Sequence, residues 1–175
     1  MNVRKFLCLL ILAGLTLLFT VSCGKKEEQP PDQVMADISA SAQVVQGDSS
    51  LSCTVTRNPE GVGVISVTQP APLEGLCFEW KGNGYGISYH GLACEASTPF
   101  LPSTSFASAI MNALEACETM DQLQIQSQED GKTVYSGSSE SGPFIITVDN
   151  QDGFIEQLSM EDLQLSVNFT RQTAS

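Results

Sequence analysis

The sequence predicts a mainly β fold of the α+β class, with about nine or ten antiparallel strands and one helix. From residue 38 onward, apolar residues alternate with Ser, Thr and Gln in short runs, and turn-forming Gly, Asp, Asn and Ser separate these runs. One segment near the middle has its apolar residues at helical spacing instead. The 175 residues are enough for one domain with a hydrophobic core and too few for two domains that each have a core of that size.

Residues 1–22 have the organisation of a secretory signal peptide. Arg4 and Lys5 precede the apolar stretch 6–21, which is shorter than the roughly 20 residues that a membrane-spanning helix needs. We therefore expect a cleaved signal peptide, with an uncleaved membrane anchor as the alternative.

The signal segment ends in the four residues 20–23, Thr-Val-Ser-Cys, which resemble the lipobox of bacterial lipoproteins. The resemblance implies cleavage between Ser22 and Cys23 and attachment of lipid, such as palmitate, to Cys23. Thr20 departs from the Leu that the family prefers at the first lipobox position. Two or more acyl chains give stable anchoring, so we expect an extracytoplasmic protein that is lipid-anchored to the bacterial cell membrane.

The chain is strongly acidic, with 20 acidic and 8 basic residues and a net charge of -12. Removal of Arg4 and Lys5 with the signal peptide leaves 6 basic residues against the 20 acidic ones, a net charge of -14. Such a chain lacks the cations that nucleic-acid binding requires, which excludes a nucleic-acid partner. Residues 23–33 are expected to form the acylated cysteine and a charged, Pro-containing tether. The single folded domain is expected over 34–171, with a tail at 172–175.

The strand pattern appears ten times along the domain. Apolar residues alternate with polar ones or form short β-rich runs in ten segments, at 38–44, 51–55, 62–69, 76–80, 85–90, 123–127, 133–137, 143–148, 153–160 and 163–169. Between the fourth and fifth segments, an Asn-Gly pair (83–84) is typical of a type I′ hairpin turn. This turn predicts that Trp80 lies opposite Ile87 and Phe78 opposite Tyr89, on one buried face.

The single helix is predicted in the segment LPSTSFASAIMNALEACE. Pro102 and the Ser/Thr residues after it can begin and cap the helix. Its apolar face is expected to carry Phe106, Ile110, Ala113, Leu114 and Cys117.

This order of elements resembles the half-barrel of lipoprotein carriers (LolA-like) and of mycobacterial lipoproteins that hold acyl chains (LppX-like). The resemblance covers most of the mature domain and implies a curled sheet, a helix packed on its concave face, and acyl-chain binding between them. The segments Gly91-Leu92, Leu101-Pro102 and Ser105–Ile110 are also similar to small clostridia-type surface lipoproteins of unknown activity.

Two functions follow for the space between sheet and helix. The first is binding of an acyl chain or another hydrophobic molecule, with a pocket formed by Phe78, Trp80, Ile87, Tyr89, Phe106, Ile110 and Leu114. The alternative is a fully packed core in a cell-envelope scaffold or interaction protein, whose sheet surface or edge strand meets a partner.

Catalytic and metal chemistry find little support in the sequence. The four cysteines of the mature domain, Cys53, Cys77, Cys94 and Cys117, can form two disulfides, or Cys53 and Cys117 can be small buried hydrophobes. They form no CxxC pair, which argues against a redox motif or a zinc site. The predicted hairpin register places Cys77 opposite His90, the only histidine, so a thiolate–imidazole pair is the third alternative. We predict no enzyme, no catalytic residue, no metal and no cofactor.

Overall fold

The computed structural model describes residues 29–81, 84–97 and 100–172. The predicted signal peptide, Ser22, Cys23 and the start of the tether lie outside the described residues. The described part contains eleven strands: β1 (Ile38–Gln46), β2 (Ser49–Arg57), β3 (Gly63–Gln69), β4 (Cys77–Lys81), β5 (Gly84–Tyr89), β6 (Leu92–Ala96), β7 (Gln124–Glu129), β8 (Lys132–Ser139), β9 (Gly142–Asp149), β10 (Ile155–Met160) and β11 (Leu165–Arg171).

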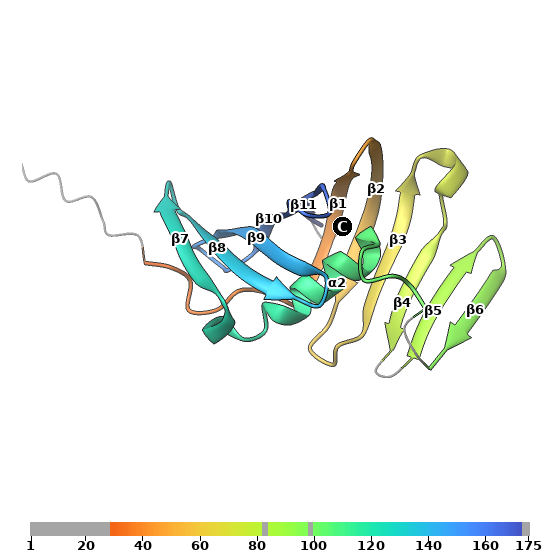
Figure 1. Cartoon of the computed structure of the whole chain (residues 1–175), viewed down its shortest axis with the longest axis horizontal. Helices are drawn as coiled ribbons and strands as arrows, with labels where there is room; N and C mark the ends of the chain where they lie inside the picture. Colours follow the sequence, from red (N-terminus) through yellow and green to blue (C-terminus); the bar gives the residue numbers. More distant parts are fainter. Residues whose placement is uncertain (1–28, 82–83, 98–99, 173–175) are drawn as a thin grey trace, which may run out of the picture.

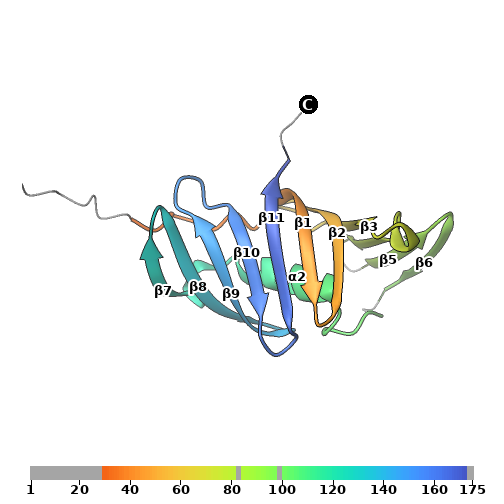
Figure 2. The ribbon, with the colours of Figure 1, turned by 90° about the horizontal axis from the view of Figure 1, so that it is seen from above.

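All eleven strands form one antiparallel sheet that curls without closing (Figures 1 and 2). Their order is β6-β5-β4-β3-β2-β1-β11-β10-β9-β8-β7. The first strand, β1, lies at the centre, where it pairs with β2 on one side and with β11 on the other. The predicted mainly β half-barrel is therefore confirmed. The strand that the sequence did not reveal is β6, whose residues are almost all exposed and so show no alternation.

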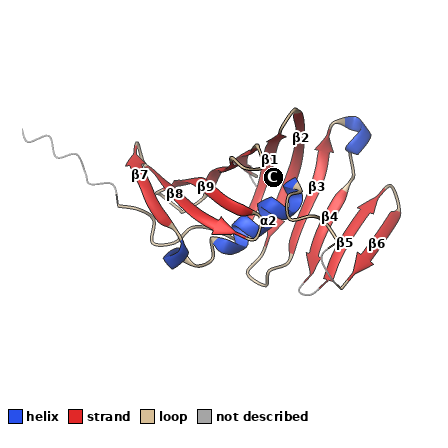
Figure 3. Ribbon diagram, viewed as in Figure 1, coloured by secondary structure: helices blue, strands red, loops and turns tan. Residues whose placement is uncertain are grey.

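The helix α2 (Phe106–Ala116) crosses the concave face of the sheet, as Figure 3 shows. It begins after Ser105, whose hydroxyl accepts a hydrogen bond from the backbone N–H of Ser108 at 3.2 Å. This bond satisfies one of the N–H groups that a helix start leaves without a partner. The helix and its Ser/Thr cap agree with the expectation from sequence.

The core lies between α2 and the middle of the sheet. Alternate residues of β1 are buried on the concave side, and Ala40 and Val44 are at most 1% exposed. On the helix, Ala109 and Ile110 are fully buried against this surface. Among the residues that the structure describes, no helix has both the length and the apolar character needed to cross a membrane.

Candidate functional site

The helix fills the concavity over the central strands. Ile110 is fully buried and Leu114 is 1% exposed, so both belong to the packed core. The small residues Ala107 and Ala113 are also buried, and they allow the helix to approach the sheet closely. Over the central strands, the described side chains therefore form a packed core without a pocket.

A cleft opens where α2 no longer covers the sheet, between the helix and strands β4 and β5. Its volume is about 410 Å³, within the range of small-molecule sites. Its apolar lining consists of Phe78, Trp80, Tyr85, Phe100, Leu101 and Met111. The polar residues of the lining are Arg57, Glu60, Glu79, Ser103, Ser108, Asn112, Glu115 and Glu140. Ligand sites are commonly concave surfaces of this size, and this one combines an aromatic floor with a largely polar edge.

The floor of the cleft follows from strand alternation. Phe78 and Trp80 lie on the face of β4 that is turned toward α2, and Gly63 of β3 lies opposite Trp80. A Cβ atom at Gly63 would overlap Cε of Met111 on the helix. The missing side chain at Gly63 thus makes room for Met111 beside Trp80.

Phe106 supports this floor from the first turn of α2. Its ring meets that of Phe78 edge to face, with the ring centroids 5.6 Å apart, a geometry that stabilises aromatic pairs. Phe78 is buried, whereas Trp80 is only half-buried. The aromatic floor of the cleft is thus fixed at Phe78, which packs against Phe106, and partly accessible at Trp80.

The predicted hairpin register is wrong by two residues. Phe78 pairs with Ile87, and Trp80 pairs with Tyr85. Lys81 pairs with Gly84, so the two paired ends are separated by residues 82 and 83, which lie outside the described residues. The observed register brings together the aromatic pair Trp80–Tyr85, a favourable cross-strand contact. A shift by two residues keeps each side chain on its predicted face and changes only its partner.

The remaining predicted pocket residues lie near the cleft without lining it. Ile87 is half-buried and packs against the core cluster. Tyr89 donates its hydroxyl to the carbonyl oxygen of Pro72 at 2.6 Å, and its ring meets that of His90. Of the seven residues predicted for the pocket, Phe78 and Trp80 line the cleft.

The Cys77–His90 pair that the sequence suggested is not formed. Cys77 lies opposite Ser88, and its Sγ is 3.5 Å from the hydroxyl of Ser66. His90 follows β5 in a turn, with φ at 48°. Among the described residues, no group of three or more His, Cys, Asp or Glu side chains is arranged to hold a metal ion.

The four cysteines of the domain are free thiols in the structure. Cys53 and Cys117 are buried, which raises the pKa of each thiol to about 12 because the thiolate would lose its hydration. The charge of Arg57 acts in the opposite direction on Cys117. Cys94, on the edge strand β6, is exposed. Cys53 and Cys117 thus occupy positions suited to small buried hydrophobes.

Arg57 lines the cleft and already forms ion pairs. Its guanidinium is 5% exposed and forms ion pairs with Glu118 and, at 3.4 Å, with Asp37. Both carboxylates are about half exposed. The pairs join the end of β2 to the residue before β1 and to the segment after α2, and they neutralise the one cation of the cleft lining.

No protein-family model and no curated protein matches the sequence. The fold is similar to the crystal structure of an uncharacterized conserved protein from Thermus thermophilus, with a TM-score of 0.53 and 12% identity over 82% of this chain and 86% of that chain.

Two further structures are similar at lower TM-scores. One is the complex of the CwlD amidase with the GerS lipoprotein from Clostridioides difficile, with a TM-score of 0.47 and 14% identity over 81% of this chain and 89% of that chain. The other is a LolA superfamily protein from Nitrosomonas europaea, with a TM-score of 0.36 and 10% identity over 79% of this chain and 66% of that chain. At such low sequence identities the similarity concerns the fold alone. Only the Thermus protein, with a TM-score of 0.53, is used to support it.

Proposed function

We propose that the protein is a non-enzymatic, extracytoplasmic lipoprotein, anchored through Cys23, that binds a hydrophobic ligand such as an acyl chain in the cleft beside α2. The cleft itself carries the proposal, because aromatic side chains and Met111 line a concave surface that the helix leaves open. The separation of Cys77 from His90 supports a binding role, since it removes the one catalytic pair that the sequence suggested.

Native mass spectrometry tests the binding role. The protein is the mature chain, residues 23–175 with Cys23→Ser to prevent acylation, exported into an oxidising compartment. We expect a bound mass that solvent extraction releases as a lipid or another hydrophobic compound. An apo mass, together with no uptake of added alkyl compounds of any head-group charge, would contradict the proposal.

A matched pair of variants locates the ligand. Trp80→Leu removes an aromatic ring from the cleft floor and is expected to lower ligand occupancy. Tyr89→Leu removes a ring from the same sheet face outside the cleft lining and should leave occupancy unchanged. Equal losses in the two variants would place the ligand elsewhere.

Membrane anchoring has its own test, metabolic labelling with palmitate in a bacterial host. The Cys23→Ala variant is expected to lose both the label and its place in the membrane fraction. The control is Cys94→Ala, which removes an exposed thiol of the domain and should keep both. Label retained by Cys23→Ala would refute the lipobox assignment.

An interaction or scaffold role is the second candidate, and the edges of the sheet favour it. Both edge strands are open to solvent: every residue of β7 is exposed, and Leu92 of β6 is 76% exposed. An exposed edge can receive a strand from another protein. This role would be favoured if the cleft binds no ligand and if a partner protein protects the amides of β6 or β7 from hydrogen exchange.

A further inference from the structure

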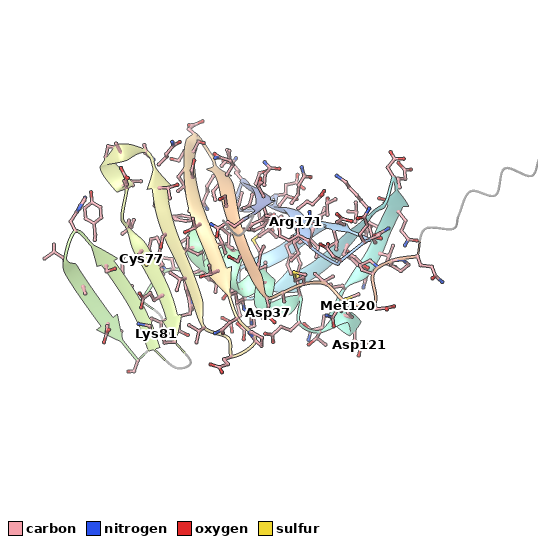
Figure 4. All side chains as sticks on the ribbon, turned by 180° about the vertical axis from the view of Figure 1, so that it is seen from behind. Asp37, Cys77, Lys81, Met120, Asp121 and Arg171 are labelled. Atoms are coloured by element: carbon pink, nitrogen blue, oxygen red, sulfur yellow. The ribbon has the colours of Figure 1, made fainter. Side chains whose placement is uncertain are left out.

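The basic side chains in the described part of the chain already form ion pairs with carboxylates. Four Lys and Arg residues lie in the described part of the chain, Arg57, Lys81, Lys132 and Arg171, and each forms an ion pair. Lys81 lies at the end of β4, the strand that begins with Cys77 (Figure 4). It pairs with Glu79, which also lines the cleft, so the charge of this carboxylate is balanced. Only Arg57 reaches the cleft, and its charge is balanced by two carboxylates.

The edge of the cleft carries negative charge without a partner. Glu60 follows β2, Glu115 is in the last turn of α2, and Glu140 lies between β8 and β9. All three side chains are exposed, and none of them forms an ion pair within the described part of the chain. These three residues, hereafter the rim carboxylates, come from three separate elements that meet around one opening.

The aromatic lining of the cleft also favours a positively charged ligand. The faces of Trp and Tyr rings attract ammonium groups within about 6 Å of the ring centroid. Trp80 and Tyr85 are paired across β4 and β5, line the cleft and are half-buried. A head group between these rings and the rim carboxylates would be attracted to both if it were cationic, and repelled by the carboxylates if it were a carboxylate or a phosphate.

We infer that the cleft selects amphiphiles with a cationic head, an alkylamine or a quaternary alkylammonium. The hydrocarbon chain lies against Phe78 and Met111, and the head lies between Trp80 and the rim carboxylates. This inference rests on the proposed function and narrows it, because it excludes free fatty acids and anionic phospholipids as preferred ligands. The cleft volume of about 410 Å³ suits a small molecule.

Trp80 provides the readout, because it is the only tryptophan of the chain. Its fluorescence is titrated in the mature Cys23→Ser chain at low salt with decyltrimethylammonium, decanoate and decyl maltoside, each below micelle formation. The three probes share the alkyl chain and differ in head-group charge. We expect decyltrimethylammonium to bind at least about tenfold tighter than decanoate, since each nearby carboxylate changes affinity several-fold at low ionic strength. The neutral probe should lie between them.

A charge-matched pair of triple variants separates a local effect from the overall acidity. Glu60→Gln/Glu115→Gln/Glu140→Gln removes the rim carboxylates and is expected to reduce the preference for the cation to about threefold or less. The control replaces three exposed glutamates that do not line the cleft, in Glu74→Gln/Glu129→Gln/Glu161→Gln, and should keep the preference. Circular dichroism and urea midpoints check that both variants fold.

The outcomes separate the two proposals. If none of the three alkyl probes binds, the proposed binding function fails and this inference fails with it. If they bind without a preference for the cation, or if both triple variants lose the preference equally, the binding function stands and the inference is overturned. Rim-dependent binding of a pentalysine peptide without binding of decyltrimethylammonium would also overturn it, in favour of a basic protein partner.

Discussion

Arg57 is a buried cation held between two carboxylates that water still reaches. Removing the cation leaves Asp37 and Glu118 able to hydrate, whereas removing both carboxylates leaves a buried charge without compensation. The two sides of this ion-pair group therefore contribute differently to stability.

We predict that Asp37→Asn/Glu118→Gln lowers the free energy of unfolding by about 3 kcal/mol or more, and that Arg57→Met lowers it by less than about 2 kcal/mol. Urea unfolding at pH 7 measures both. The control is Asp48→Asn/Glu115→Gln, which removes two exposed carboxylates that have no ion pair in the described part of the chain and should change stability by under about 0.5 kcal/mol. A larger loss for Arg57→Met than for the double carboxylate variant would contradict this view.

The cysteines give a second test at the scale of single residues. Thiolates react with alkylating reagents and thiols do not, and burial raises the pKa of Cys53 and Cys117 to about 12. At pH 8 we expect iodoacetamide to modify the exposed Cys94 first, and Cys53 and Cys117 only after unfolding in urea.

Peptide mapping by mass spectrometry reads the order of modification in the mature Cys23→Ser chain. Rapid modification of Cys117 in the folded protein would contradict the packing described for the region after α2. A mass lower by two or four hydrogens would instead reveal disulfides, the alternative that the sequence left open.

At the scale of elements, the helix depends on its first turn. Ser105 caps α2 through the N–H of Ser108, and the same turn places Phe106 against Phe78. Loss of the cap therefore affects both helix stability and the floor of the cleft.

We predict that Ser105→Ala lowers the free energy of unfolding by about 1 kcal/mol, whereas Ser105→Asp preserves stability because an aspartate oxygen can accept the same bond. Chemical denaturation of the two variants provides the comparison. Equal losses for Ala and Asp would show that the hydroxyl acts through something other than capping.

The elements also show what a sequence can reveal. Alternation identified β1 because one of its faces is buried and the other is in water. It could not identify β6, which is exposed on both faces. The Asn-Gly signal located the β4–β5 hairpin but not its register, because the choice between two registers rests on side-chain pairs such as Trp80–Tyr85.

The cleft depends on tertiary packing and was only partly predictable. Ile110 and Leu114 were predicted for the pocket by helical spacing, which marks a buried face but cannot tell a filled core from an open one. Tyr85 was missed because the predicted register gave Trp80 another partner. Met111 was missed because its place in the cleft depends on Gly63, about fifty residues earlier in the chain.

At the scale of the whole molecule, β11 joins the two halves of the sheet. It pairs with β1 on one side and with β10 on the other. Its loss would therefore remove a strand from the middle of the sheet rather than from an edge.

We predict that deleting residues 165–175 abolishes cooperative unfolding, because β1 and β10 both lose a partner and the core loses Val167 and Leu165. Thermal unfolding followed by circular dichroism measures this. Deleting residues 173–175, which removes none of the described residues, serves as the control and should leave the transition unchanged. A cooperative transition in the shorter chain would show that the two halves fold independently.

The central place of β1 also sets the order of events during synthesis. The chain emerges from its N-terminus, so β1 to β6 can pair in succession, but the second edge of β1 waits for residue 165. At a synthesis rate of roughly 5–20 residues per second, this wait lasts on the order of 6–24 s. An unpaired strand is a template for pairing with other chains. Newly synthesised chains are therefore most prone to associate with one another in the interval before β11 has been made.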